Sequence, residues 1–594
     1  MSIERLHNRI DLIDIPFTDR GSRLLVFRQG HELSIRLAER WVKWENEVGH
    51  YRQRPPLVTD FTFLSATGEP LLDIKADTYP DRIHLHTSVG TFDWVFLDAE
   101  TLLVRLPVGR YGFSFTVYAQ DAQNDYRGGA MHGKRNFAYT TNARLFENRI
   151  EAIEDDHFHV ETQLEARAGD ALLLNITPRL GYNRSIPNAD KALEAAQARW
   201  QAWFDLVPPV LDEYRDQYLY AWWIMRSGLV NTRYFFTREA LLPSKIHYVG
   251  VWHWDQVFHA LAYRHVDTNL AEDQLRIVLD HQRPDGMLPD AIHDEGLVTH
   301  LEKPVNADVT KPPIMTWAVL KMYETSRHDD FLKEVYEPLV RWNHWWMTAN
   351  RNGNGLCEYH HPFSSGLDDN PLWDAGMPVV APDLNTYLVL QHESLAQIAR
   401  HIGEKEAAER YEQEAARMLA DMVEQLWDEA VGVFRAYHDG QPLPTLTPFG
   451  LLPLLTGKLP EPITRRLITS LTDPDLFWTP YPLSTVAVSD PTFNPMQMWR
   501  GPVWINVNYF FVEALKGNGY HELAGELRRK TLNLLMQHSD IYEYYNPLTG
   551  ERPVKAAPMF GWSAALFIEL ALDETAARES TKRLSAKADR FMGH

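Results

Sequence analysis

Residues 383–426 read DLNTYLVLQHESLAQIARHIGEKEAAERYEQEAARMLADMVEQL, and this stretch decides the fold of most of the chain. Apolar residues recur at helical spacing in both halves: Leu384, Leu388, Leu395, Ile398 and Ile402, then Tyr411, Ala415, Met418, Met422 and Leu426. Between the halves stands Gly403, a residue typical of a helix C-cap. The pattern predicts two helices joined by a short turn, a helical hairpin.

Similar helical pairs recur from about residue 210 to about residue 575, joined by loops of unequal length. No sequence repeat of fixed period accompanies them, which disfavours a regular solenoid. We therefore predict a closed toroid of paired helices that carries long functional loops at one end.

Residues 1–180 show a different periodicity, because apolar and polar residues alternate between short breaks at Gly, Asp and Pro. In the stretch that begins at Asp81, Ile83 and Leu85 face one way while His84 and His86 face the other. Such strands predict an antiparallel β-sandwich.

The predicted fold class is accordingly α+β with several domains, because 594 residues exceed what one hydrophobic core normally holds. The predicted boundaries are a β-sandwich at 1–180, a helical linker at 181–210, a helical catalytic domain at 211–575 and a tail at 576–594.

Composition narrows the function. A formal net charge of −21 disfavours nucleic acid as a partner. The single cysteine, Cys357, excludes an intramolecular disulfide and disfavours a cysteine-based zinc site. An N-terminus without an apolar core, and no long apolar run elsewhere, predict a cytoplasmic protein that does not enter membranes. The 19 Trp, 25 Tyr and 26 Phe suit a pocket for a small carbohydrate, and homo-oligomerisation is left open.

The loop FSSGLDDNPLWD, residues 363–374, contains the carboxylates Asp368, Asp369 and Asp374. Asp in such a setting often caps a helix or closes a turn, which is the alternative for each of them. Cleavage of a glycosidic bond, however, needs two carboxylates on opposite sides of a sugar. A second carboxylate, Glu543, stands in the equally aromatic segment IYEYYNPLTGERP.

Three further segments place charged side chains beside aromatic rings: WHWDQVFH (252–259), VTKPPIMTW (309–317) and MWRGPVWINVNYF (498–510). Packing in the core is the alternative for each segment alone. Together with the two acidic loops, they predict one sugar-binding site.

These segments, with QRPDGMLPD (282–290) and FGWSAA (560–565), resemble the motifs of glycoside hydrolase family 63 and, more distantly, trehalases of family 37, over residues 240–570. The resemblance implies an (α/α)6 barrel and inverting hydrolysis of α-linked glucosides. It implies that Asp368 is the general acid and Glu543 the general base. The substrate-binding residues predicted with them are Trp254, Asp255, Lys311, Trp373, Trp499, Arg500, Trp504 and Tyr545.

The segment NRNGNGLCE, residues 350–358, spaces side-chain oxygens much like the first half of a calcium loop. The candidate ligands are Asn350, Asn352, Asn354 and Glu358. Relatives with calcium here carry an acidic residue where this chain has Asn350, so a structural calcium and a metal-free turn are both alternatives. The chemistry itself requires no cofactor.

The resulting hypothesis is an inverting, exo-acting α-glycosidase for a small α-glucoside, a disaccharide or a glucosyl conjugate. One alternative is a glucosylglycerate or mannosylglycerate hydrolase, although the resemblance implies that such enzymes are compact barrels without a large β-domain. Another is an inverting disaccharide phosphorylase, which Glu543 disfavours because a base carboxylate repels phosphate. A non-enzymatic carbohydrate-binding protein is disfavoured because both carboxylates are present.

Overall fold

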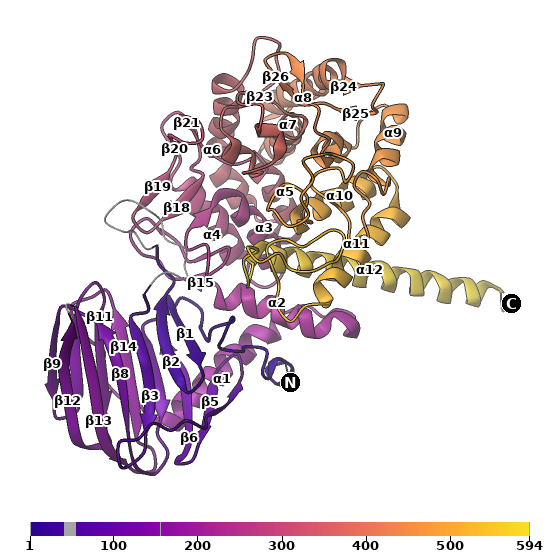
Figure 1. Ribbon diagram of the computed structural model, residues 1–594. Coiled ribbons are helices and arrows are strands. Elements are labelled where there is room, and N and C mark those ends of the chain that lie inside the picture. The colour runs from indigo at the N-terminus through magenta and orange to yellow at the C-terminus, as the bar shows by residue number, and fades with distance from the viewer. Residues whose placement is uncertain (1, 41–54, 155, 593–594) are drawn as a thin grey trace. The chain divides into compact units, whose positions relative to one another are not determined.

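The computed structural model describes residues 2–40, 55–154 and 156–592 and divides into two compact units (Figure 1). The first unit comprises Met1–Val207, Trp222–Asn231 and Ser244–Val249. The second comprises Pro208–Ala221, Thr232–Pro243 and Gly250–His594. Each unit is described by itself.

The first unit is built on two antiparallel sheets, as the alternation predicts. A six-stranded sheet has the order β1 (Leu24–Gln29), β2 (Glu32–Leu37), β3 (Val58–Leu64), β8 (Gly109–Tyr118), β13 (His157–Ala166), β12 (Arg144–Glu154). An eight-stranded sheet has the order β4 (Lys75–Thr78), β5 (Ile83–Thr87), β6 (Gly90–Asp98), β7 (Thr101–Arg105), β14 (Ala171–Thr177), β11 (Asn136–Thr141), β10 (Gly128–His132), β9 (Asp121–Asp125).

Aromatic rings join the two sheets face to face. Phe63 of β3 stacks on Phe92 of β6 with ring centroids 3.7 Å apart, and Phe61 meets Trp94 edge to face at 5.4 Å. In β5, Ile83 and Leu85 are buried in this core, as predicted, because successive strand residues point to opposite faces.

Helix α1 (Ala189–Asp205) covers part of the eight-stranded sheet (Figure 1). It begins at Asn188, whose side chain accepts a hydrogen bond from the backbone N–H of Lys191. Its Ala192 and Ala196 join Val95 of β6 in one apolar cluster. The segment predicted as a helical linker therefore packs on the sheet.

The second unit consists mainly of helices joined by loops and two-residue or three-residue strands. Its helices are α3 (His253–Tyr263), α4 (Thr268–Leu279), α5 (Met315–Ser326), α6 (Asp329–Ala349), α7 (Pro382–Ile402), α8 (Lys405–Leu426), the 3₁₀ helix η6 (Pro448–Thr456), α9 (Glu461–Leu471), α10 (Ile505–Gly517), α11 (His521–Met536) and α12 (Gly561–Met592). A further helix, α2 (Arg215–Ser227), precedes them. Helix α12 continues through residues predicted to form a tail.

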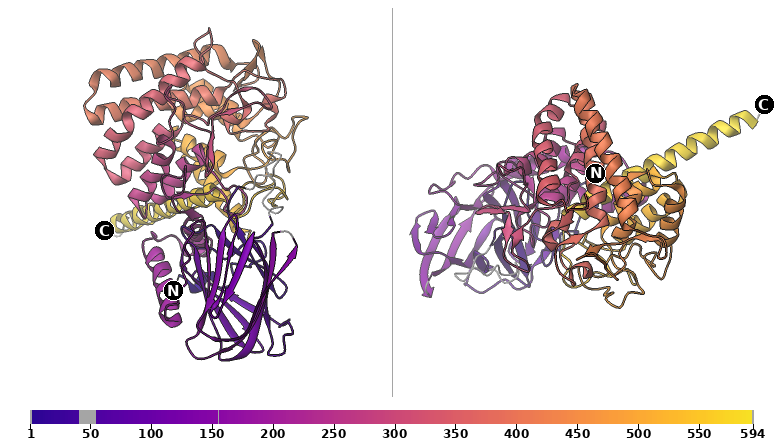
Figure 2. Two further views of the ribbon diagram at one scale, coloured as in Figure 1. Left: turned by 90° about the vertical axis from the view of Figure 1, so that its left-hand side faces the viewer. Right: turned by 90° about the horizontal axis from the view of Figure 1, so that it is seen from above.

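The predicted hairpin of residues 383–426 is confirmed as α7 and α8, which lie side by side (Figure 2). Gly403 ends α7 with φ +93°, and its N–H donates to the carbonyl of Ala399, because glycine adopts this left-handed conformation without steric cost. In the apolar stripe of α8, Met418 and Met422 are fully buried, whereas Tyr411 is partly buried.

Helix contacts in the second unit follow a closed circuit. Helix α3 contacts α5, α5 contacts α7, α7 contacts η6, η6 contacts α10, α10 contacts α12, and α12 contacts α3. The intervening helices pair with members of this circuit: α4 with α3, α6 with α5 and α7, α8 with α7, α9 with η6, and α11 with α10 and α12. The circuit brings the loops that precede its members toward one another.

Within residues 2–40, 55–154 and 156–592, no helix combines the length and the apolar character that crossing a membrane requires.

Candidate active site

The loop that precedes α7 is held by its own side chains and positions Asp368. Its two 3₁₀ turns are η4 (Pro362–Ser365) and η5 (Pro371–Trp373). Asn370 caps η5 by accepting from the N–H of Leu372, and its amide donates to the carbonyl of Trp499, 2.9 Å away. Trp373 donates its indole N–H to the carbonyl of Leu367 at 2.7 Å. The carboxyl of Asp368 therefore projects from a fixed turn.

One oxygen of the Asp368 carboxyl is shielded from water. Its side chain is 32% exposed, yet Oδ1 is buried and accepts no hydrogen bond from the described part of the chain. Burial raises the pKa of Asp368 to about 7, while the ammonium of Lys311, 3.8 Å from Oδ1, acts in the opposite direction. A carboxyl with this pKa carries a proton below neutrality and can donate it, as a general acid must.

Lys311 lies in the segment between β21 (Ala307–Asp308) and α5. Its Nζ is 2.7 Å from Asp290 Oδ1 and donates to the carbonyl of Phe363 at 2.7 Å. The neighbouring Thr310 donates its hydroxyl to the carbonyl of Leu288 at 2.7 Å. These bonds join the loop of Asp368 to the segment that ends at Asp290.

A small sheet brings Asp255 to the same place. Strands β17 (Val251–Trp252) and β18 (Ala291–His293) pair antiparallel, and the N–H of His253 donates to the carbonyl of Asp290 at 3.0 Å. Helix α3 begins there, so Asp255 lies in its first turn. Burial raises the pKa of Asp255 well above its ordinary value; Lys311 opposes this, and the carboxylate of Glu543 adds to it. Asp255 thus lies within electrostatic reach of both the Asp368 side and the Glu543 side.

Glu543 is buried in the loop between α11 and α12. The N–H of Ala557 donates to Glu543 Oε2 at 3.0 Å, and the N–H of Glu543 donates back to the carbonyl of Ala557 at 3.0 Å. Asp540 ties the same loop: it accepts from the Tyr220 hydroxyl at 2.8 Å and from the N–H of Met559 at 3.1 Å. These bonds hold the carboxylate of Glu543 at a fixed position. Burial also raises the pKa of Asp540 to about 6.

Four tryptophans join the helix ends around these carboxyls. Trp499 and Trp504 stack with centroids 3.7 Å apart. Trp254 lies 6.2 Å from Trp499 and meets Trp562 edge to face at 5.3 Å. The ring of Tyr544, next to Glu543, lies 4.9 Å from Trp504. Aromatic residues of four distant segments thus form one cluster, and such rings suit the apolar faces of a sugar.

Gly366 permits the closest approach in this cluster. It has φ +74°, and a Cβ at this position would lie 2.3 Å from Cζ2 of Trp254. No side chain fits there, so the ring of Trp254 requires a glycine at position 366.

The other two carboxylates of the loop tie it to the segment around Arg500. Asp369 accepts from the N–H of Trp499 at 2.9 Å and from Gln497 Nε2 at 3.0 Å. Asp374 forms a two-pronged ion pair with Arg500, whose Nη1 also donates to the carbonyl of Asp369 at 3.1 Å. The three acids of FSSGLDDNPLWD thus divide into two groups. Asp368 is the candidate general acid, and Asp369 and Asp374 fix the loop to the segment around Arg500.

Two predicted substrate-binding residues contact mainly the protein itself. The ring of Trp373 meets Tyr359 edge to face at 5.8 Å. Tyr545 is fully buried and accepts from the N–H of Tyr542 through its hydroxyl at 2.8 Å, while its backbone pairs with Val503. Their contact with a sugar stays a prediction.

The candidate calcium ligands already make contacts within the protein. Asn352 Oδ1 already accepts from the N–H groups of Asn354 and Leu356. Asn350 is buried at the C-terminus of α6, and Glu358 Oε1 lies 3.2 Å from His360 Nε2. The described residues contain no group of three or more His, Cys, Asp or Glu that could hold a metal. This arrangement fits the alternative of a metal-free turn.

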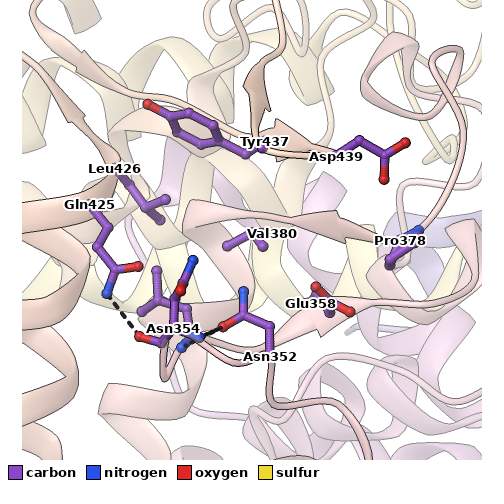
Figure 3. A pocket seen from close by; sticks show the side chains of 11 residues that line it. Asn352, Asn354, Glu358, Pro378, Val380, Gln425, Leu426, Tyr437 and Asp439 are labelled. Carbon is purple, nitrogen blue, oxygen red and sulfur yellow. Dashed lines mark hydrogen bonds between the residues drawn. The ribbon is translucent and has the colours of Figure 1, made fainter.

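Three of these residues instead line a pocket of about 320 Å³ (Figure 3). Asn352, Asn354 and Glu358 form one side, and Tyr437 with Asp439 forms the other. Gln425 donates to the carbonyl of Asn354 at 3.0 Å. The pocket is polar on both sides.

Sequence reasoning missed Asp290, Asp540, Tyr544 and Trp562 as members of the site. Asp290 and Trp562 stand inside motifs that carry the family resemblance, so their signal was present. The sequence around Asp540 does not mark it, because its hydrogen-bond partner Tyr220 lies far away in the sequence.

The model for the mannosylglycerate hydrolase MGH1-like glycoside hydrolase domain matches residues 248–563, more than half of the chain, and the chain belongs to this family. It is a glycoside hydrolase, and its resemblance to family 63 is confirmed.

Among solved structures, the chain is similar to the GH63 mannosylglycerate hydrolase of Thermus thermophilus in complex with glucose, at 27% identity and a TM-score of 0.51 over 58% of this chain and 97% of that one. The glucosylglycerate hydrolase of Mycolicibacterium hassiacum is 24% identical over 54% of this chain and 92% of its own length. A bacterial glucoamylase complexed with acarbose shares the fold at a TM-score of 0.55 and 11% identity, over 94% of both chains.

Proposed function

We propose that this chain is an inverting, exo-acting α-glycosidase that hydrolyses a small α-glucoside. In this mechanism Asp368 gives its proton to the glycosidic oxygen as the bond to the anomeric carbon breaks. Glu543 takes a proton from the water that attacks this carbon on the opposite face, so that the sugar leaves with inverted configuration. The two carboxyl groups should then lie roughly 6.5–9.5 Å apart, which leaves room for the water.

One observation carries the proposal: Asp368 has a pKa of about 7 in the loop beside the tryptophan cluster, and the buried Asp255 lies within electrostatic reach of both Lys311 and Glu543. These relations support the placement of a proton donor and a second carboxylate in one aromatic site.

We infer further that residues 211–575 form an (α/α)6 barrel and that residues 1–180 form a separate β-domain. The closed circuit of helix contacts and the paired outer helices support this barrel. The β-domain lies outside the residues matched by the family model.

For the aglycone, we propose a neutral group such as a second sugar. Two cations adjoin the loop of Asp368, and each already has a carboxylate partner: Lys311 is paired with Asp290, and Arg500 with Asp374. A substrate carboxylate would have to compete with these partners. The second candidate is glucosylglycerate or mannosylglycerate, favoured by the activities for which the relatives are named.

Proton NMR tests the reaction directly. The purified protein is incubated with α-linked glucose disaccharides, trehalose, glucosylglycerate and mannosylglycerate, with and without phosphate. Asp368→Asn and Glu543→Gln serve as parallel variants. We expect β-glucose to appear first from a neutral disaccharide, and each variant to lose about 10²–10⁴-fold in kcat.

Each other outcome removes a defined part of the proposal. If α-glucose appears first, the inverting role of Glu543 is wrong. A strict need for phosphate indicates a phosphorylase, and release of β-mannose or β-glucose from a glycerate conjugate alone establishes the second candidate. If wild type and both variants cleave equally, the assignment of both carboxylates fails.

A further inference from the structure

Asp290 is built into the wall behind the candidate acid without being one of the two reacting carboxyls. It is 4% exposed, its N–H donates to the carbonyl of Val298, and its carbonyl accepts from the N–H of His253. The backbone on both sides of Asp290 is thus fixed by β18, β19 (Gly296–Val298) and the start of α3.

The ammonium of Lys311 stands between two carboxyls at unequal distances. Asp290 Oδ1 is 2.7 Å from Nζ, whereas Asp368 Oδ1 is 3.8 Å from it. The carbonyl of Phe363 takes a further N–H of the ammonium at 2.7 Å. Two short contacts therefore hold the cation closer to Asp290 than to Asp368.

The remaining charges near this group set the balance. Burial acts to lower the pKa of Lys311, but Asp290 and then Asp368 and Asp255 outweigh it, so the pKa is raised and the amine is charged. Asp369 faces Asp368 as a further carboxylate. The ammonium of Lys311 acts electrostatically on two imidazoles, those of His253 and His361. Burial lowers the pKa of both, so both are neutral near pH 7.

We propose that Asp290 is a positioning residue: by pairing with Lys311 it keeps this cation from forming a full ion pair with Asp368, so that Asp368 retains the proton needed for catalysis. The inference rests on the proposed role of Asp368 as general acid. Without the carboxylate of Asp290, the buried ammonium has Asp368 as its nearest anionic partner, and the ionised form of Asp368 is favoured because opposite charges attract strongly at low local dielectric.

The test uses Asp290→Asn, Lys311→Met and the double variant in the full-length protein. Both single changes keep the side-chain size but remove one charge. If Asp290 acts through Lys311, the two changes shift the titration of Asp368 in opposite directions. The double variant should then titrate like Lys311→Met, because Asp290 has no cation left to hold, as expected for coupled neighbours.

The first readout is the pH dependence of kcat and of kcat/KM on the substrate that NMR identifies. We expect the basic limb of Asp290→Asn to move by about 1–3 pH units to lower pH, and that of Lys311→Met to move to higher pH. If both variants lose activity while the basic limb stays in place, Asp290 and Lys311 are only contacts for the sugar and the inference is overturned.

The second readout does not depend on turnover. Infrared difference spectra between each background and its Asp368→Asn counterpart follow the C=O band of the protonated Asp368 carboxyl as pH rises. The midpoint should fall in Asp290→Asn and rise in Lys311→Met. If these shifts occur in a protein that cleaves nothing, the positioning by Asp290 stands and the proposed function fails; unchanged midpoints in an active enzyme overturn the inference alone.

Glu574→Gln provides a matched control. It breaks another buried ion pair, in which Arg528 Nε donates to Glu574 Oε2 at 2.8 Å between α11 and α12. It should lower the melting temperature without moving the basic limb. A limb shift of equal size in this control would mean that general loosening, rather than Asp290, causes the effect.

Discussion

Replacing Gly366 by Ala tests whether the loop of Asp368, residues 363–374 (the acid loop), needs its close contact with Trp254 to hold its position. Gly366 has φ +74°, so a side chain there strains the backbone by about 1–2 kcal/mol. The added Cβ would also lie 2.3 Å from Cζ2 and 2.4 Å from Cη2 of Trp254. Overpacking of this kind costs about 1–3 kcal/mol, so the total is about 2–5 kcal/mol.

Gly403→Ala separates the two contributions. Gly403 has φ +93° as the C-cap of α7, but a Cβ there would meet no atom within 4 Å. It should therefore cost only the backbone strain, about 1–2 kcal/mol. The difference between the two variants measures the collision with Trp254.

The assay combines thermal unfolding with steady-state kinetics. Gly366→Ala should melt below Gly403→Ala and lose about 10²-fold in kcat/KM, because Asp368 lies two residues along the displaced loop. Gly403→Ala should retain the wild-type kcat/KM. Equal melting temperatures, together with full activity of Gly366→Ala, would refute the reasoning that the ring of Trp254 fixes the acid loop.

Three further predictions follow from the same contacts. Activity should fall as pH rises through about 7, because Asp368 must be protonated to act and its raised pKa of about 7 places its deprotonation there; a pH–rate profile with no basic limb near neutrality would contradict this. Asp369→Ala should lower kcat/KM more than Asp374→Asn. Asp369 accepts from the buried N–H of Trp499, and removing this acceptor costs about 1–3 kcal/mol, whereas the side chain of Asp374 is 54% exposed. If Asp374→Asn lowers kcat/KM more, the ion pair with Arg500 matters more than the bond to Trp499. Prolonged treatment with EDTA should leave kcat/KM and the melting temperature unchanged, because Asn352 Oδ1 is already occupied by backbone N–H groups; a fall that calcium restores would disprove the metal-free turn.

The local pattern of the chain predicted much of the fold because burial repeats with the period of each element. The stripe of α8 and the alternation of β5 were both readable in this way. Helix α1 was read as a linker because its amphipathic pattern does not say what its apolar side covers. The partner is the apolar outer side of β6, β7 and β14.

The candidate site was predictable where one short motif carries both a carboxylate and its aromatic neighbours, as around Asp368 and Glu543. Partners that lie far apart in the sequence were not predictable. The motif around Arg500 predicts contact with a sugar, but it does not predict the pairing of the guanidinium with Asp374. The segment of Asp290 looks like a turn, and its ion pair with Lys311 follows only from the packing of β18 beside the start of α3.

The closed circuit of helix contacts also sets the order in which activity can arise during synthesis. Helix α12 touches both α3 and α10, so the circuit is complete only after the last of its members has left the ribosome. The loop of Glu543 lies directly before this helix, whereas Asp368 emerges much earlier. A growing chain therefore carries the proposed proton donor well before the second carboxylate, and contacts between such distant segments make ring closure a slow, late step of folding.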